Sequence, residues 1–236
     1  MKCVLSLGVL VIISISSMAM AADDIEIVLE AELANRIVNP VAVAVPIDAK
    51  NAGGVETDEA SNGQFVWAPG APVTGGGGSG YAEYIIEIPE KDTYAVWGRV
   101  IAWDGNSDSF WVTWEPADPA ENPQQTQNFD FRWATASGGT WHWDRINQWL
   151  DAGTFDRQWE FDAGDTTSLK IWSREDATML DCLFITTNLG TDAAAVGVRM
   201  PDDADRELQV KGGGGAVDAA GKLSTTWGGM KSGYRN

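Results

Sequence analysis

Tryptophan side chains are the most distinctive chemical groups of this 236-residue chain, which holds 12 of them beside 4 tyrosines and 7 phenylalanines. Most indoles of a folded domain belong to its core, where they bury a large area. Four stand beside turn residues instead: Trp67, Trp103, Trp141 and Trp143. An indole face in a loop can stack on the apolar face of a pyranose ring. These four side chains are therefore candidate ligand-binding residues.

Residues for the common catalytic mechanisms are scarce. His142 is the single histidine, it stands between two tryptophans, and no serine-nucleophile elbow occurs in the chain. Glycines 75–78 neither precede a lysine nor open a helix, so they are typical of a loop rather than of a phosphate-binding turn. A glycosidase or polysaccharide lyase stays a less favoured alternative, because 34 acidic residues contain many carboxylate pairs. We predict a protein that is not an enzyme.

The charge of the chain limits its partners. It carries 34 acidic and 16 basic residues, a net charge of −18. Such a surface repels phosphate backbones, which excludes nucleic acid as a partner, and it disfavours anionic membranes. This acidity has two alternative explanations: solubility outside the cell, and the binding of a divalent cation by clustered carboxylates.

The first 21 residues are typical of a secretory signal peptide. Lys2 gives the positive start, residues 4–15 form the apolar stretch, and Ala19-Met20-Ala21 the cleavage site. About 20 apolar residues are needed to span a bilayer, so we expect no membrane insertion. The predicted location is secreted or at the cell surface. Cys182 is then the single cysteine of the mature chain, which leaves no partner for an intramolecular disulfide.

Short β-rich runs bounded by turn residues dominate the region from 22 to 189. We expect strands at 25–32, 63–67, 81–88, 93–103, 108–115, 127–134, 140–149, 157–161, 168–173 and 179–187. Because the connections are hairpin-like, the pattern predicts an all-β fold, an antiparallel β-sandwich.

The composition changes after residue 189. Residues 190–236 are rich in Ala, Asp and Gly, with glycines at 212–215, and too few of them are apolar to form a core. We interpret them as a flexible C-terminal tail of unknown role, whose Trp227 and Tyr234 dock on the domain or on a protein partner. The domain should then fold without this tail.

Several motifs occur in an order that resembles carbohydrate-binding modules of families 6 and 35. These are Leu29-Glu30-Ala31-Glu32, Gly63-Gln64-Phe65-Val66-Trp67, Thr93-Tyr94-Ala95-Val96-Trp97-Gly98-Arg99-Val100, Asp108-Ser109-Phe110-Trp111-Val112, Trp141-His142-Trp143 and Leu180-Asp181-Cys182-Leu183-Phe184-Ile185-Thr186. The resemblance covers about residues 25–188. It implies a galactose-binding-like jelly roll.

The resemblance also implies a metal site and a sugar site. Glu30 or Glu32, with Asp181, would hold a structural calcium ion that joins the first and last strands. The alternative is that one of these carboxylates pairs with Arg99 or Arg174. Asn188, after the last strand, would orient a sugar that lies against the loop tryptophans.

Two functions therefore compete with catalysis. The favoured one is non-catalytic binding of a glycan or polysaccharide by a secreted module. The other is an extracellular structural or adhesive protein that uses the same sandwich for contacts with proteins. Binding to a glycan array without turnover would distinguish the first from the second.

Overall fold

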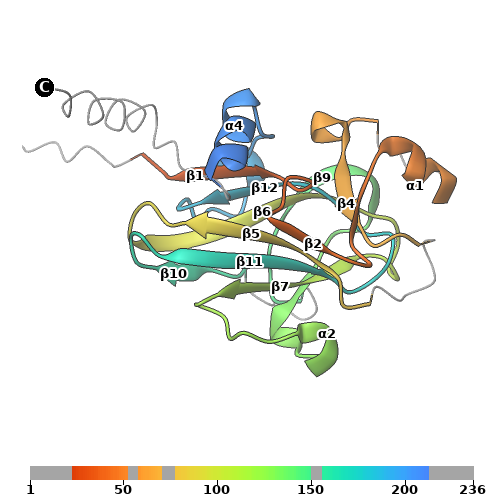
Figure 1. Cartoon of the computed structure of the whole chain (residues 1–236), viewed down its shortest axis with the longest axis horizontal. Helices are drawn as coiled ribbons and strands as arrows, with labels where there is room; N and C mark the ends of the chain where they lie inside the picture. Colours follow the sequence, from red (N-terminus) through yellow and green to blue (C-terminus); the bar gives the residue numbers. More distant parts are fainter. Residues whose placement is uncertain (1–22, 53–57, 71–77, 150–155, 213–236) are drawn as a thin grey trace, which may run out of the picture.

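Two antiparallel sheets packed face to face form the fold (Figure 1). The computed structural model describes residues 23–52, 58–70, 78–149 and 156–212. The larger sheet has seven strands: β1 (Glu26–Glu30), β3 (Ala42–Ala44), β4 (Phe65–Trp67), β6 (Asp92–Ala102), β9 (Gly138–Arg145), β10 (Trp159–Phe161) and β12 (Met179–Thr186). The smaller has five: β2 (Arg36–Val38), β5 (Tyr81–Glu87), β7 (Ser109–Glu115), β8 (Arg132–Ala134) and β11 (Thr166–Ser173).

Strands β6 and β12 run antiparallel through the middle of the larger sheet, and their register defines its two ends. Met179 of β12 lies opposite Ile101 and Trp67, whereas Thr186 lies opposite Ala95 and Glu26. We call the first end, with its connections 68–70, 103–108, 135–137 and 174–178, the loop end. The far end holds the connections 88–91, 116–118, 162–165 and 187–190.

The core fills the space between the sheets and follows the period of two along each strand. Leu169 and Ile171 of β11 point into it, as do Val112 of β7 and Leu183 of β12, and all are nearly inaccessible to water. Burying each such side chain contributes about 1.5–3 kcal/mol. The expected all-β sandwich of jelly-roll type is confirmed.

Each of the ten expected segments contains a strand, but the strand expected at 127–134 starts only at Arg132. Between 122 and 134 only β8 is extended, and the helices α2 (Pro123–Thr126) and η2 (Phe129–Phe131) precede it. The Asn122 and Asn128 side chains accept hydrogen bonds from the backbone at Gln125 and Asp130. These caps stabilise the first helical turns and stop the strand from starting earlier.

Short helices lie on the outer face of the larger sheet. They are α1 (Pro46–Ala52), η1 (Ser61–Gly63), α3 (Ala193–Val196) and α4 (Asp203–Gly212). In Figure 1, α4 lies beside β1 and β12. No helix in the described part of the chain is long and apolar enough to cross a membrane.

The C-terminal region corrects one expectation from the sequence. Residues 190–212, which we assigned to a flexible tail, fold back onto the sandwich, because α3 contributes apolar side chains and α4 contributes polar ones to the surface of the larger sheet. Residues 213–236, with Trp227 and Tyr234, lie outside the described residues, and so does the expected signal peptide at 1–21.

Candidate functional site

Three of the four predicted tryptophans lie in one cluster near the loop end. Trp67, Trp103 and Trp141 pack with Phe65, Ile101 and Met179 on the outer face of the larger sheet. They meet because Trp67 and Ile101 both flank Met179 in the sheet and β9 runs beside β6. Trp67 is only 6% exposed, whereas Trp103 and Trp141 are half-buried. Trp67 is therefore a packing residue rather than an open platform.

Trp103 has the more available ring of the two half-buried indoles. The ring of Trp141 meets Phe65 edge-on, with centroids 5.8 Å apart, and the Arg99 guanidinium lies 5.4 Å from its centroid. Among the described residues, no aromatic ring or guanidinium stacks on Trp103, which follows β6 directly and leads into the turn at Asp104. This position suits a ring that stacks on a ligand.

Buried polar atoms without hydrogen-bond partners gather at the loop end. Trp103 Nε1, Ser107 Oγ and Thr178 Oγ1 are inaccessible and bond to no other described residue. Trp103 and Ser107 lie in the connection from β6 to β7, and Thr178 lies in the connection from β11 to β12, so the three belong to two loops of the same end. Nearly all buried polar atoms of native proteins have a partner, whether protein or ordered water. These atoms thus retain hydrogen-bonding capacity that the described part of the chain does not use.

Charged side chains also lie in the connections of the loop end and on the strands beside them. Arg174 donates to Ser109 Oγ and pairs with Glu175, whose carboxylate also accepts a bond from the Asp108 backbone at 2.9 Å. Arg132 approaches the Asp108 carboxylate at 3.7 Å. Burial, and then the charge of Glu175, raise the pKa of Asp108. The loop end thus offers donors and acceptors of both charges beside an indole.

The other two predicted ligand residues lie elsewhere. Trp143 packs against Val28, Trp97 and Phe184, where α3 covers them. Asn188 lies at the far end, roughly 20 Å from the cluster at the rise of a strand over the length of β12. Its amide donates to Asp24 at 2.8 Å and accepts from the Gly190 backbone at 3.0 Å. The expected pairing of Asn188 with the loop tryptophans is therefore wrong, because they lie at opposite ends of the strand.

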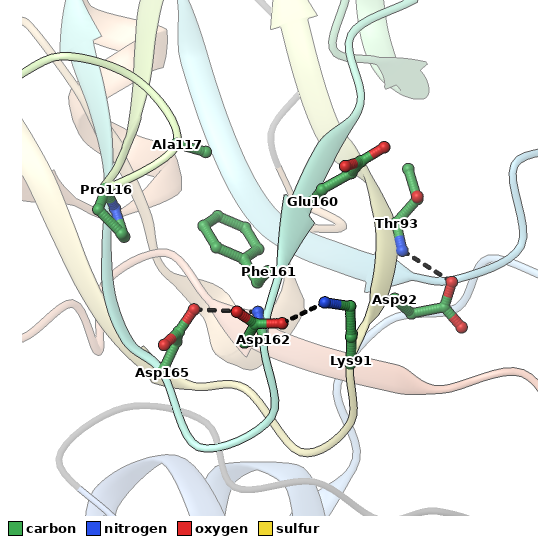
Figure 2. Close-up of a pocket in the computed structure, with 9 residues that line it drawn as sticks. All are labelled: Lys91, Asp92, Thr93, Pro116, Ala117, Glu160, Phe161, Asp162 and Asp165. Carbon is green, nitrogen blue, oxygen red and sulfur yellow. Dashed lines mark hydrogen bonds and ion pairs between the residues drawn. The ribbon is translucent and has the colours of Figure 1, made fainter.

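A pocket that the sequence did not indicate lies at the far end (Figure 2). It has a volume of about 620 Å³ and is lined by Lys91, Asp92, Thr93, Pro116, Ala117, Glu160, Phe161, Asp162 and Asp165. Lys91 pairs with Asp162 at 2.6 Å, and both side chains are largely exposed. Only the turn residues at 88–91 and 162–165 could have pointed to this place, and turns are common in any sandwich.

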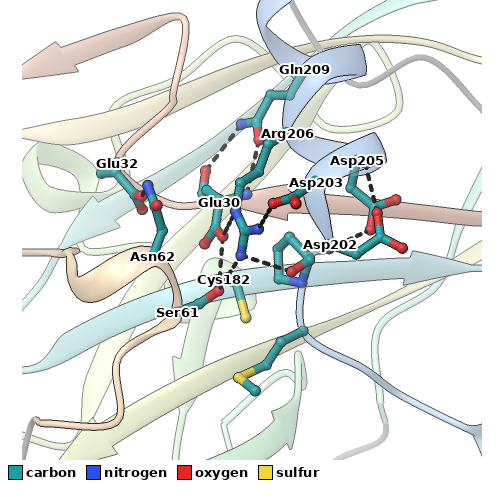
Figure 3. A network of polar contacts seen from close by, with 12 residues as sticks. Glu30, Glu32, Ser61, Asn62, Cys182, Asp202, Asp203, Asp205, Arg206 and Gln209 are labelled. Carbon is teal, nitrogen blue, oxygen red and sulfur yellow. Dashed lines mark hydrogen bonds and ion pairs between the residues drawn. The ribbon is translucent and has the colours of Figure 1, made fainter.

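The predicted calcium ligands Glu30, Glu32 and Asp181 gather near β1 and η1, but each has a partner within the protein. Figure 3 shows Glu30 and Glu32 with their partners. Asp181 pairs with Arg99 and also accepts a bond from the Ser61 backbone at 2.7 Å. This is the Arg99 pairing that the sequence left open. Arg174, the other arginine considered, lies at the loop end.

The glutamates have different partners. Glu30 Oε1 accepts from Ser61 Oγ at 2.8 Å and from Arg206 Nε at 2.8 Å, and Glu32 Oε1 accepts from Asn62 Nδ2 at 2.9 Å. Burial raises the pKa of Glu30 to about 7, and the charge of Glu32 adds to this rise. Burial also raises the pKa of Glu32 and of Asp181.

These side chains do not fit a calcium ion. Calcium takes six to eight oxygen ligands, and the oxygens here that accept no hydrogen bond are Glu30 Oε2 and Glu32 Oε2. Within the described ranges, no group of three or more His, Cys, Asp or Glu side chains is placed to hold a metal ion. Calcium binding itself stays a prediction from the sequence.

Solved structures similar to this chain include carbohydrate-binding modules of families 35 and 6. One is a family 35 module from Clostridium thermocellum, with a TM-score of 0.42 and 13% identity over 68% of this chain and 96% of that one. Another is the C-terminal family 6 module of a marine laminarinase from Zobellia galactanivorans, with a TM-score of 0.41 and 17% identity over 68% and 98% of the two chains.

A third similar structure is a carbohydrate-binding module of the Cellvibrio mixtus lichenase 5A in complex with cellotriose. It has a TM-score of 0.39 and 16% identity over 67% of this chain and 94% of that one. No protein-family model matches this chain. No curated protein matches its sequence either.

Proposed function

We propose that this chain is a secreted module that binds a glycan or polysaccharide at its loop end without catalysing a reaction. The observation that carries the proposal is the half-buried Trp103 at the loop end, whose connections also hold the charged side chains of Asp108, Arg174 and Glu175. A sugar needs both an apolar surface for one face of its ring and polar groups that fix its orientation. The loop end offers the two together.

Recognition at this site needs no covalent step. The Trp103 indole stacks against the C–H face of a pyranose and excludes water from it. Carboxylates such as Asp108 and Glu175 accept hydrogen bonds from sugar hydroxyls, and the guanidinium of Arg174 donates to them. Both kinds of group lie at the loop end, with Trp103 on the larger sheet and Arg174 beside Trp111 of the smaller sheet. Binding without turnover is also what the resemblance of the sequence implies.

A glycan array tests the proposal, followed by calorimetry with the best ligand on the parent, Trp103→Ala and Trp143→Ala. We expect Trp103→Ala to weaken binding by about 1–3 kcal/mol, which is roughly 5- to 150-fold in Kd. Trp143→Ala also removes an indole, but from the cluster that α3 covers and not from the loop end. It should therefore affect stability while leaving the Kd within about twofold of the parent.

The far-end pocket supplies the contrary outcome. Thr93→Ala and Glu160→Gln alter its lining and leave the loop end untouched. If these variants lose affinity while Trp103→Ala and Trp141→Ala bind as well as the parent, the site is the pocket. If no glycan on the array binds and a protein ligand is found instead, the structural or adhesive function replaces the one proposed here.

A further inference from the structure

The C-terminal helix α4 contributes a guanidinium to a completely buried carboxylate of the first strand. Glu30 of β1 has no exposed side-chain surface, and Arg206 of α4 lies 176 residues further along the chain. Arg206 Nε donates to Glu30 Oε1 at 2.8 Å, and Nη2 lies 3.4 Å from Ser61 Oγ. Figure 3 shows Arg206 reaching from α4 to this cluster.

The guanidinium is itself held in place. Arg206 Nη2 donates to the Pro201 carbonyl at 2.9 Å, and Nη1 pairs with Asp203 at 2.9 Å. Its side chain is 26% exposed. The guanidinium thus has partners on α4, on the segment before α4 and on the sandwich. Because these contacts already restrict the side chain, it loses little further conformational freedom when it pairs with Glu30.

Gln209, one turn further along α4, binds the backbone of the same strand residue. Its Oε1 accepts from the Glu30 backbone N–H at 2.9 Å, and its Nε2 donates to the Glu30 carbonyl at 3.0 Å. Gln209 is only 5% exposed. The Gln209 amide therefore satisfies the backbone N–H and C=O of Glu30, which the pairing of β1 with β12 leaves without a partner.

Two arginines thus balance the carboxylates between which the sequence places a calcium ion. Arg99 from β6 neutralises Asp181, and Arg206 from α4 neutralises Glu30. A metal ion that took Glu30 Oε1 and Asp181 Oδ2 as ligands would have to displace both guanidinium groups from their hydrogen bonds with these buried oxygens. Breaking a buried ion pair by removing one partner is strongly destabilising.

We infer that α4 is a built-in clamp, in which Arg206 joins the C-terminal segment to β1 in place of a divalent cation, so that the fold does not depend on calcium. Arg206 thus supplies the positive charge that balances the Glu30 carboxylate of β1. Residues up to 212 therefore belong to the folded module.

Thermal unfolding of the full chain in EDTA and in millimolar CaCl₂ tests the clamp. For the parent, we expect the same Tm in both solutions, within about 1 °C. Arg206→Gln should lower the Tm by roughly 5–10 °C, because Glu30 loses its buried partner. The matched control is Lys211→Gln on the same helix, whose pair with Glu207 is largely exposed and should change the Tm by less than about 2 °C.

Two results would overturn the inference. One is a parent whose Tm falls in EDTA or rises in CaCl₂, because the ion would then be part of the native fold. The other is an Arg206→Gln variant that melts like Lys211→Gln. If Arg206→Gln fails to fold, the double variant Glu30→Gln with Arg206→Gln decides the matter. It removes the buried charge of Glu30 and leaves only the exposed Asp203 without its partner, so it should fold. A double variant that also fails to fold contradicts the clamp.

Discussion

Replacement of Gln209 by Ala should destabilise the whole sandwich, although the residue lies in a segment that the sequence assigns to a tail. Its side chain is 5% exposed and bonds to both backbone groups of Glu30 and, at 3.2 Å, to the Leu33 carbonyl. Leu33 is half-buried, so water can replace the third bond. Glu30 is buried, so its N–H and C=O would be left without a partner.

The size of the effect follows from these two groups. A buried donor or acceptor that loses its partner costs about 1–3 kcal/mol, so the two groups together should lower the free energy of unfolding of Gln209→Ala by about 2–6 kcal/mol. For a domain of 150–250 residues this corresponds to a fall in Tm of roughly 4–24 °C. Urea unfolding followed by tryptophan fluorescence gives the free energy, and calorimetry gives the Tm.

The neighbouring residue offers a matched control. Val210 is 69% exposed, and Val210→Ala on the same helix should change the free energy of unfolding by less than about 0.5 kcal/mol. If Gln209→Ala and Val210→Ala unfold at the same urea concentration with the same slope, α4 is not part of the cooperative unit. The reasoning that joins it to β1 would then be refuted.

Two further perturbations test the architecture. A chain that ends at residue 189 should have a Tm roughly 10 °C below that of a chain that ends at 212, because Glu30 loses Arg206 and the cluster of Val28, Trp97 and Phe184 loses the side chains of α3. Calorimetric Tm values that differ by less than about 3 °C would contradict this. Gly98→Ala should cost about 1–3 kcal/mol in urea unfolding, because its Cβ would lie 2.3 Å from the Trp133 ring, and an unchanged midpoint would mean that this ring moves aside freely.

The strand pattern could be predicted from the sequence because it depends on local signals. Alternation along 168–173 correctly places Leu169 and Ile171 in the core, and the turn residues between the runs mark where β5, β6, β7, β11 and β12 begin and end. The short strands β2 and β3 were missed. The strand predicted at 127–134 starts only at Arg132, because capping by Asn128 favours the helical turn η2 at Phe129–Phe131.

The candidate site was only partly predictable. Turn residues beside Trp67, Trp103 and Trp141 correctly indicated a group of indoles near one end of the sandwich. The sequence could not show which of them stays open, because that depends on the packing of Phe65 and Arg99 around Trp67 and Trp141. Asn188 was placed at the wrong end, since adjacency to a strand does not tell which end of the sheet that strand reaches.

The sequence by itself determined the class of fold and the residue types available for binding, because hydrophobic alternation, turn chemistry and tryptophan content are local properties of the chain. Tertiary structure alone decided the partners of the buried charges. Glu30 could pair with a cation or with any arginine, and only the docking of α4 brings Arg206 to it across 176 residues. Such a contact leaves no trace in local sequence, because the guanidinium that neutralises a buried carboxylate is selected by the path of the whole chain and not by its neighbours.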